Sequence, residues 1–315
     1  MSGAPGMEPG GGEHAPVLMG QVLGSLAIRA DGCYVDATFG RGGHAGAILG
    51  RLGEEGKLLA IDRDPEASAA ATRLFADDPR ATFVQARFSE LGQHVVAGSV
   101  DGVLFDLGVS SPQLDEARRG FSFLRDGPLD MRMDPQSGES AAAFLARAGE
   151  REIFMVIARL GEERHARRIA RAIVAARDTV PIATTGRLAG IVAACVPGRQ
   201  PGRHPATRTF QALRIHVNDE LGEIERALPQ AVAALAPGGR LVVISFHSLE
   251  DRIVKRFMRS ASREDPAWAG MPELPAAARP RLKLVGRAVF ADAAEVQRNP
   301  RARSAVLRAA ERLAA

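Results

Sequence analysis

The stretch that decides the fold is Cys33-Tyr-Val-Asp-Ala-Thr-Phe-Gly-Arg-Gly-Gly-His-Ala45. Residues 33–37 predict a strand, the glycines that follow predict a tight turn, and residues 45–52 predict a helix. A glycine turn between a strand and a helix lets a nucleotide-like ligand approach the backbone and the N–H groups of the helix. The turn also fits the pattern Gly-x-Gly-x-x-Ala, which occurs in dinucleotide-binding proteins.

Strands and helices alternate on both sides of this turn. Helices are expected at residues 16–28 and 66–75, and further strands at residues 58–61, 82–85 and 100–105. Alternating elements of this length predict a parallel sheet covered by helices on both faces, with ligands bound beyond the carboxyl ends of the strands. The predicted fold class is therefore α/β.

The alternation stops between about residues 113 and 207, where the sequence is mostly helical. One helix there has a buried stripe at helical spacing, formed by Ile153, Val156, Ile157 and Leu160. The alternation resumes with a helix at residues 209–235, a strand at 240–246, and two final strands at 283–290 and 304–308. We therefore expect a disordered tail (1–13), a sheet domain in two parts (14–112 and 208–315) and an inserted helical domain (113–207).

Composition narrows the class of protein. Hydrophobic residues make up 46% and charged residues 25% of the 315 residues, which suits a globular chain with its own core. The chain has two cysteines, Cys33 and Cys195, which are too few for a disulfide framework or a thiolate zinc site. We therefore expect no metal, and we expect the protein to occupy a reducing compartment. The sequence has no signal-peptide pattern and no apolar run near the roughly 18 residues of a membrane span, which predicts a soluble, cytoplasmic protein.

Three aspartates end predicted strands. Asp36 ends the first strand, Asp62 the second and Asp106 the fourth, so the three carboxylates should surround one crevice. An anionic rim suits S-adenosylmethionine, which carries a sulfonium and an ammonium, whereas the pyrophosphate of a dinucleotide would be repelled. An oxidoreductase that uses NAD stays as the alternative, because the glycine pattern alone also fits that cofactor.

Arginine supplies nearly all of the positive charge. Four arginines at helical spacing form one face within the insert: Arg164, Arg167, Arg168 and Arg171. Guanidinium groups bind phosphates in a bidentate manner, so this stripe could bind RNA. A solvated helix face is the competing interpretation, and the sequence leaves both open.

Two other enzyme classes are disfavoured. Ser245, His247 and Asp251 contain the residue types of a hydrolase triad, but the chain lacks the Gly-x-Ser-x-Gly nucleophile elbow. Residues 248–251 are better interpreted as the capping motif of a helix that begins at Ser248. A zinc nucleobase deaminase is excluded because two distant cysteines cannot supply its Pro-Cys-x-x-Cys motif.

Eight segments, in order along nearly the whole chain, resemble the bacterial 16S ribosomal RNA cytosine-N4 methyltransferase family. They are residues 14–18, 36–44, 60–65, 106–115, 127–134, 204–214, 244–252 and 299–304. The most distinctive are Asp36-Ala-Thr-Phe-Gly-Arg-Gly-Gly-His44 and Ile244-Ser-Phe-His-Ser-Leu-Glu-Asp-Arg252. The chain departs from the family in the glycine-rich tail before His14 and in a Pro/Ala-rich loop near Trp268, and neither bears on the chemistry.

The resemblance implies a Rossmann-like fold that binds S-adenosylmethionine and carries an inserted helical domain. It also implies methylation of the N4 amino group of a cytidine in the decoding region of 16S ribosomal RNA, with the small ribosomal subunit as partner. The cofactor residues that it implies are Gly42, Gly43, His44, Asp62 for the ribose, Phe88 near the adenine, and Asp106 and Gln113 near the methionine end. A noncatalytic RNA-binding or assembly factor with the same fold is the second alternative.

The chemistry requires acceptors for the N–H groups of N4, since the lone pair of that nitrogen is conjugated into the cytosine ring. Asp106 and the backbone carbonyls from Leu107 to Ser110 are expected to supply them, so we take Asp106 and Ser110 as the catalytic candidates. Many amino-group methyltransferases have Asp/Asn-Pro-Pro-aromatic after the fourth strand, and this chain has no aromatic residue there. The residue that stacks on the base is therefore not assigned. Further RNA-binding candidates are Arg208, Lys255, Arg256, Arg301 and Arg303.

Overall fold

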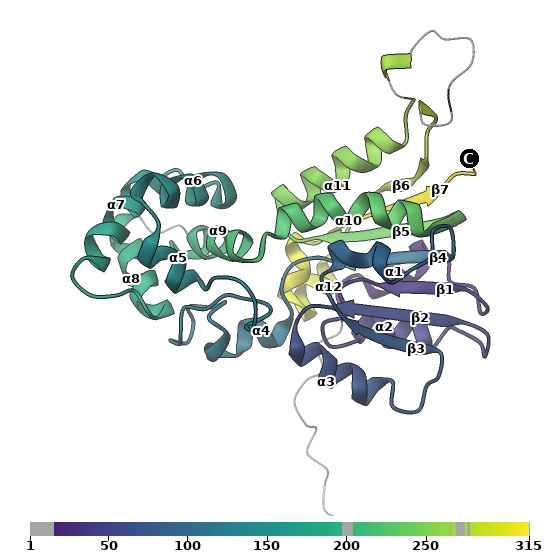
Figure 1. The fold of residues 1–315 in the computed structure, drawn as a ribbon, viewed down its shortest axis with the longest axis horizontal. Coiled ribbons are helices and arrows are strands. Elements are labelled where there is room, and N and C mark those ends of the chain that lie inside the picture. Colours follow the sequence, from purple (N-terminus) through teal and green to yellow (C-terminus); the bar gives the residue numbers. More distant parts are fainter. Residues whose placement is uncertain (1–15, 197–203, 265, 269–274, 276–277, 315) are drawn as a thin grey trace, which may run out of the picture.

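The computed structural model describes residues 16–196, 204–264, 266–268, 275 and 278–314. The tail expected at residues 1–13 lies outside these. Figure 1 shows a large body built around a sheet and a smaller helical body beside it. None of the helices in the described ranges is both long and apolar enough to cross a membrane.

The described residues form one seven-stranded sheet with the order β3-β2-β1-β4-β5-β7-β6. The strands are β1 (Cys33–Asp36), β2 (Lys57–Asp62), β3 (Ala81–Gln85), β4 (Val100–Asp106), β5 (Leu235–Ser245), β6 (Leu282–Phe290) and β7 (Val306–Arg312). The first five strands pair in parallel, and β7 pairs antiparallel with both of its neighbours, β5 and β6. The predicted α/β class is confirmed, and the strand order reverses between β1 and β4, where sheets of this kind bind ligands.

Helices cover both faces of the sheet, as predicted. They are α1 (Met19–Leu26), α2 (Gly43–Leu49), α3 (Pro65–Leu74), α10 (Glu220–Ala234), α11 (Ser248–Ala261) and α12 (Ala293–Arg298). One buried apolar cluster joins α1, α2 and α3 to the sheet, and a second joins α10 and α11 to it. Neighbouring residues of a strand point to opposite faces, so Tyr34 of β1 lies in the first cluster and Val35 lies in the second.

The insert has a core of its own. Its elements are α4 (Ser111–Asp115), a short 3-10 helix η2 (Ala117–Arg119), α5 (Ala141–Arg147), α6 (Glu150–Gly161), α7 (Ala166–Arg177), α8 (Thr185–Cys195) and α9 (Thr207–Asn218). The predicted stripe of α6 is largely buried, because Ile153 and Ile157 are fully covered. A third apolar cluster contains residues of α5 to α9 and none of the sheet.

The prediction of a single helix at residues 209–235 is wrong, because two helices occupy this range. Asp219 has a left-handed backbone (φ 50°) and separates α9 from α10. Phe210 and Leu213 of α9 pack in the core of the insert, whereas Ile224 and Leu228 of α10 pack on the sheet. Since α9 packs with the insert, we propose that the insert ends near residue 218 and not at residue 207.

Candidate active site

The carboxyl ends of β1, β2 and β4 meet at the point where the strand order reverses. Asp36 of β1 lies in register with Ala60 of β2 and with Leu104 of β4, so the strand ends are adjacent. Asp62 and Asp106, the last residues of β2 and β4, therefore lie at the same edge as Asp36. The structure thus brings together the three carboxylates that the sequence predicted to share one crevice.

Asp62 holds the glycine turn against the loop that follows β2. Its Oδ2 accepts the Gly40 N–H at 2.7 Å, and its Oδ1 accepts the Asp64 N–H at 2.9 Å. Burial raises the pKa of the Asp62 carboxyl, although these two N–H donors oppose the increase. Each carboxylate oxygen has a second lone pair, so Asp62 can also accept hydroxyl donors from a ribose.

The glycines at the start of α2 are closely surrounded by neighbouring side chains. Gly42 has φ +82°, and a Cβ there would lie 2.8 Å from the Phe39 ring. A Cβ on Gly43 would collide with Pro16. A side chain at either position would therefore force its neighbours to shift, and at Gly42 it would also strain the left-handed backbone.

His44 faces two of the three strand-end carboxylates. Its side chain is buried, and its Nε2 lies 3.5 Å from Asp106 Oδ2. Burial lowers the pKa of His44, but the contact with Asp106 and the charges of Asp106 and Asp36 outweigh burial, so the pKa is raised. The imidazole therefore carries positive charge more readily than a free histidine does.

Among the described residues, Asp36 and Asp106 each keep one oxygen without a hydrogen-bond partner. Asp36 Oδ1 accepts the Thr38 N–H at 3.2 Å, and the Thr38 hydroxyl accepts the Asp106 N–H at 2.6 Å. Within the described ranges, the buried atoms Asp36 Oδ2 and Asp106 Oδ1 have no hydrogen-bond partner. Buried carboxylate oxygens in this state favour a cationic or N–H-donating ligand, and S-adenosylmethionine fits that requirement.

Asp36 should make stability depend on pH. Burial raises the pKa of Asp36 to about 7 from its ordinary value of 3.8. Between these values the folded state binds more protons than the unfolded state, so the free energy of unfolding falls as pH rises, by about 4 kcal/mol for this group. We expect Asp36→Asn to lose this decline and to be more stable than the wild type at pH 8, measured by urea unfolding from pH 4 to pH 8. Parallel curves for the two proteins would contradict the assignment.

Gln113 joins two loops at the edge of the crevice. Its Oε1 accepts the Ser110 N–H at 2.9 Å, and its Nε2 donates to Asp64 Oδ2 at 2.7 Å. The side chain is buried, so the loop after β4 is fixed to the loop after β2. Gln113 thus sets the spacing of the two loops between which the cofactor is expected.

The remaining predicted residues near the crevice are Phe88 and Ser110. Phe88 begins a 3-10 helix, η1 (Phe88–Gln93), and packs edge-on against Phe105 of β4 with ring centroids 5.7 Å apart. Ser110 directly precedes α4, and its carbonyl oxygen accepts the Leu114 N–H at 3.4 Å. That carbonyl already takes part in helix α4, which leaves Asp106 as the stronger candidate for an acceptor of the amine.

A buried cluster of charges lies at the end of β5. Arg214 donates to both oxygens of Glu220, at 2.8 and 2.7 Å, and its guanidinium lies 3.4 Å from His247 Nε2. His247 Nε2 is also 3.2 Å from Glu250 Oε1. Carboxylate and imidazole atoms of Glu220, His247 and Glu250 come within 4.8 Å of one another, as in metal sites, but here Arg214 supplies the positive charge.

The capping motif lies at residues 247–250, one residue earlier than the expected 248–251. The structure has His247 at the N-cap of α11, and its Nδ1 accepts the Glu250 N–H at 3.4 Å. Glu250 in turn accepts the N–H of Phe246 and of His247. The capping box therefore uses an imidazole in place of a hydroxyl, which the sequence pattern does not reveal.

A hydrolase triad is absent from the described residues at this position. Asp251 is paired with Arg308 at 2.7 Å, and His247 is paired with Glu250. Ser245 is buried, and its hydroxyl has no hydrogen-bond partner among the described residues. This agrees with the missing nucleophile elbow.

The arginine stripe is exposed on the surface of the insert. Arg164 precedes α7, whereas Arg167, Arg168 and Arg171 lie on it, and all four side chains are exposed. Arg167 lies 5.4 Å from the centroid of the Phe154 ring, and Arg171 is 3.9 Å from Glu150. In Figure 1, α7 is on the side of the insert away from the sheet, whereas Arg164 is two residues from Glu162, which pairs with Arg252 of α11 at 3.1 Å.

The other RNA-binding candidates are divided between two environments. Lys255, Arg256 and Arg303 are exposed. Arg208 is half-buried and donates to the Glu162 carbonyl at 3.0 Å. Arg301 bonds to the hydroxyl of Ser111 and lies 3.5 Å from Asp115, which places it beside α4 and the crevice.

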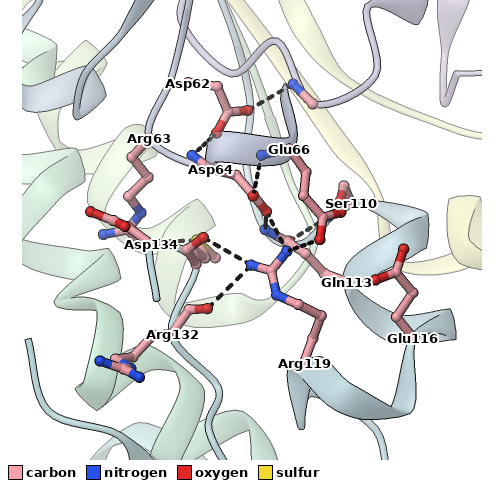
Figure 2. A network of polar contacts seen from close by, with 12 residues as sticks. Asp62, Arg63, Asp64, Glu66, Ser110, Gln113, Glu116, Arg119, Arg132 and Asp134 are labelled. Atoms are coloured by element: carbon pink, nitrogen blue, oxygen red, sulfur yellow. Dashed lines mark hydrogen bonds and ion pairs between the residues drawn. The ribbon is translucent and has the colours of Figure 1, made fainter. Parts of the chain in front are cut away.

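A network that the sequence analysis missed connects the crevice to the insert. Figure 2 shows the buried guanidinium of Arg119 directed at Asp64, next to Gln113 and Glu66. Arg119 Nη1 lies 2.9 Å from Asp64 Oδ2 and 3.4 Å from Glu66 Oε1. Its Nη2 donates to the Met133 carbonyl at 2.8 Å. Asp64 has a local sequence signal, as the N-cap before Pro65 of α3, whereas the contacts of Arg119 have none.

The chain is similar to known proteins along nearly its whole length. The model of the MraW methylase family matches residues 11–313. The chain belongs to this family. Its relatives include the Ribosomal RNA small subunit methyltransferase H of Halorhodospira halophila, 60% identical over 97% of this chain and 96% of that protein. Proteins of the same name from Thioalkalivibrio sulfidiphilus and Thiobacillus denitrificans are 58% and 59% identical, over 96% and 98% of this chain and 98% and 99% of theirs.

Proposed function

We propose that this protein methylates the N4 amino group of a cytidine in the decoding region of 16S ribosomal RNA, with S-adenosylmethionine as the methyl donor and the small ribosomal subunit as partner. The single observation that carries the proposal is Asp106, which ends β4 at the reversal point of the sheet. Its Oδ1 has no hydrogen-bond partner in the described part of the chain, and its Oδ2 faces His44. The match of the whole family model supports the substrate class.

Residues from three loops would hold the methyl donor. Asp62 would accept the ribose hydroxyls, Phe88 would lie against the adenine, and Asp106 and Gln113 would face the methionine end. The turn at residues 42–44 would border the site at the start of α2. Bound there, S-adenosylmethionine supplies an electrophilic methyl group on a sulfonium.

The residues of the chain then have to orient and deprotonate the amine. N4 carries two hydrogens and loses one of them after the methyl group is attached. Asp106 Oδ1 can accept an N–H hydrogen bond from N4, which favours a pyramidal nitrogen with an available lone pair, and can afterwards take the proton. His44 lies beside the other oxygen of this carboxylate, Oδ2, and its raised pKa favours the positively charged imidazole. That charge stabilises the Asp106 carboxylate, which orients the amine.

Nucleoside analysis tests the proposal directly. Ribosomal RNA from cells with and without the protein is digested, and the nucleosides are identified by mass spectrometry. We expect N4-methylated cytidine to disappear from 16S RNA when the protein is absent and to return when purified protein and labelled methyl donor are added to undermodified small subunits. Binding of the subunits without label transfer would favour a noncatalytic assembly factor.

Asp62→Ala should weaken cofactor binding. The variant loses the acceptor for the ribose and also the contact that holds Gly40, so we expect an affinity loss of about 1–3 kcal/mol. Isothermal titration with S-adenosylmethionine measures it, and Asp77→Ala, an exposed aspartate between α3 and β3, is the matched control. Equal affinity for wild type and Asp62→Ala would remove Asp62 from the ribose site.

A further inference from the structure

The tripeptide Met131-Arg132-Met133 is held from two sides by buried polar groups. Arg119 binds both of its ends, because its carbonyl accepts the Met131 N–H at 3.0 Å while its side chain donates to the Met133 carbonyl. Asn218 does the same from the other side: its Nδ2 donates to the Met131 carbonyl at 2.7 Å, and its Oδ1 accepts the Met133 N–H at 2.8 Å. Both side chains are buried, so the tripeptide has little freedom to move.

The tripeptide adopts a conformation that it would not keep on its own. Met131 is fully buried and has φ +64°, a left-handed backbone that is unfavourable for a residue with a Cβ. Strained backbone of this kind persists only where surrounding contacts fix it, and it is concentrated at functional sites. Arg119 and Asn218 supply those contacts.

The same contacts join the cofactor end of the sheet to the insert. Arg119 reaches Asp64, which is two residues from Asp62 and bonds to Gln113. Arg63, between the two aspartates, donates to the Asn218 carbonyl at 3.0 Å and to Met133 Sδ at 2.9 Å. Asn218 is the last residue of α9, where the insert returns to the sheet.

From this arrangement we propose that Arg119 is a positioning residue for methyl transfer. It fixes the insert relative to the cofactor loops, so that a cytidine held by RNA contacts on the insert meets the methyl group in line. The inference rests on the proposed function, since it requires an RNA substrate that contacts the insert. Displacement of a reacting atom by about 1 Å can slow a reaction by about 100-fold, so the effect should appear in the transfer rate and not in the affinity for either ligand.

The test compares Arg119→Lys with Arg118→Lys by single-turnover methyl transfer to undermodified small subunits. A lysine at position 119 keeps the charge beside Asp64 but cannot also donate to the Met133 carbonyl as the planar guanidinium does. Arg118 is adjacent, exposed, and paired with Glu66 and Glu116, so its variant controls for the loss of an arginine. Rates are expressed per cofactor-binding site, determined by titration with S-adenosylhomocysteine, which removes any unfolded fraction.

We expect Arg119→Lys to transfer about 30-fold more slowly or worse, with dissociation constants for cofactor and subunit within about threefold of the wild type. Asn218→Ala should act through the same tripeptide, so the effects of the two substitutions should not be independent. Adding Asn218→Ala to Arg119→Lys should slow transfer by a smaller factor than Asn218→Ala slows the wild type. Three results would overturn the inference. They are a wild-type rate per site in Arg119→Lys, a loss confined to either dissociation constant, and independent effects of the two substitutions. An inactive wild type would overturn the proposed function as well, whereas an active wild type with an equally active Arg119→Lys overturns only the role of Arg119.

Discussion

Single-turnover methyl transfer by Asp106→Ala should be about a hundredfold slower than by the wild type at saturating cofactor. Two contributions are lost together in this variant. The amine loses the acceptor that Asp106 Oδ1 offers, and the buried His44 loses its nearest carboxylate, 3.5 Å away. The loss should persist at every cofactor concentration, because the amine and not only the cofactor depends on this carboxylate.

Asp101→Asn is the matched control for Asp106→Ala. Asp101 lies at the opposite end of β4, where it accepts the Cys33 N–H at 2.8 Å and pairs with Arg29 at 2.9 Å. Its amide variant keeps the acceptor for Cys33, so transfer should remain close to the wild-type rate. If Asp106→Ala transfers the methyl group at the wild-type rate at saturating cofactor, Asp106 has no role in the transfer step.

The second large effect is expected from the arginine stripe. Replacing Arg164, Arg167, Arg168 and Arg171 together by glutamine should weaken binding of the small subunit by about a hundredfold at low salt, if all four contact phosphates. It should also reduce the slope of log affinity against log salt by about 3, since each contact to single-stranded RNA contributes about 0.7. Affinity for S-adenosylmethionine should not change, because α7 is remote from the strand ends (Figure 1).

The matched control replaces the same four arginines by lysine, which keeps the charge and should keep most of the salt dependence. Since α7 lies away from the crevice, any RNA that it binds must be distant from the methylated base. Equal slopes for the wild type and the glutamine variant would mean that the stripe is a solvated surface. The RNA contacts would then have to come from exposed residues nearer the sheet, such as Lys255, Arg256 and Arg303.

The Arg→Gln comparison also tests an interpretation that the sequence left open. Glu162 and Glu163, which directly precede the stripe, are candidate partners for it by sequence. In the structure Glu162 pairs with Arg252 of α11 at 3.1 Å, and Glu163 accepts the His165 N–H at 2.8 Å. The glutamates next to the stripe are therefore used for other contacts. The stripe has different neighbours, Phe154 beside Arg167 and Glu150 beside Arg171.

The sequence by itself determined the sheet and the carboxylates of the crevice. Buried strands, glycine turns and helices are local patterns, and parallel strands always bring their carboxyl ends to one edge. For this reason the positions of Asp36, Asp62 and Asp106 in the sequence were enough to place them together. The resemblance to the methyltransferase family followed from the same local segments.

Only the tertiary structure decided how the insert is attached. Asp64, Arg119, Met133 and Asn218 come from four separate segments, and their contacts depend on where those segments lie in the folded chain. The break at Asp219 was invisible because α9 and α10 are both amphipathic and directly adjacent, while the two faces pack in different cores. The distance of α7 from the crevice was hidden for the same reason: periodicity shows which side of a helix is apolar, but it contains no information on which body that side packs against.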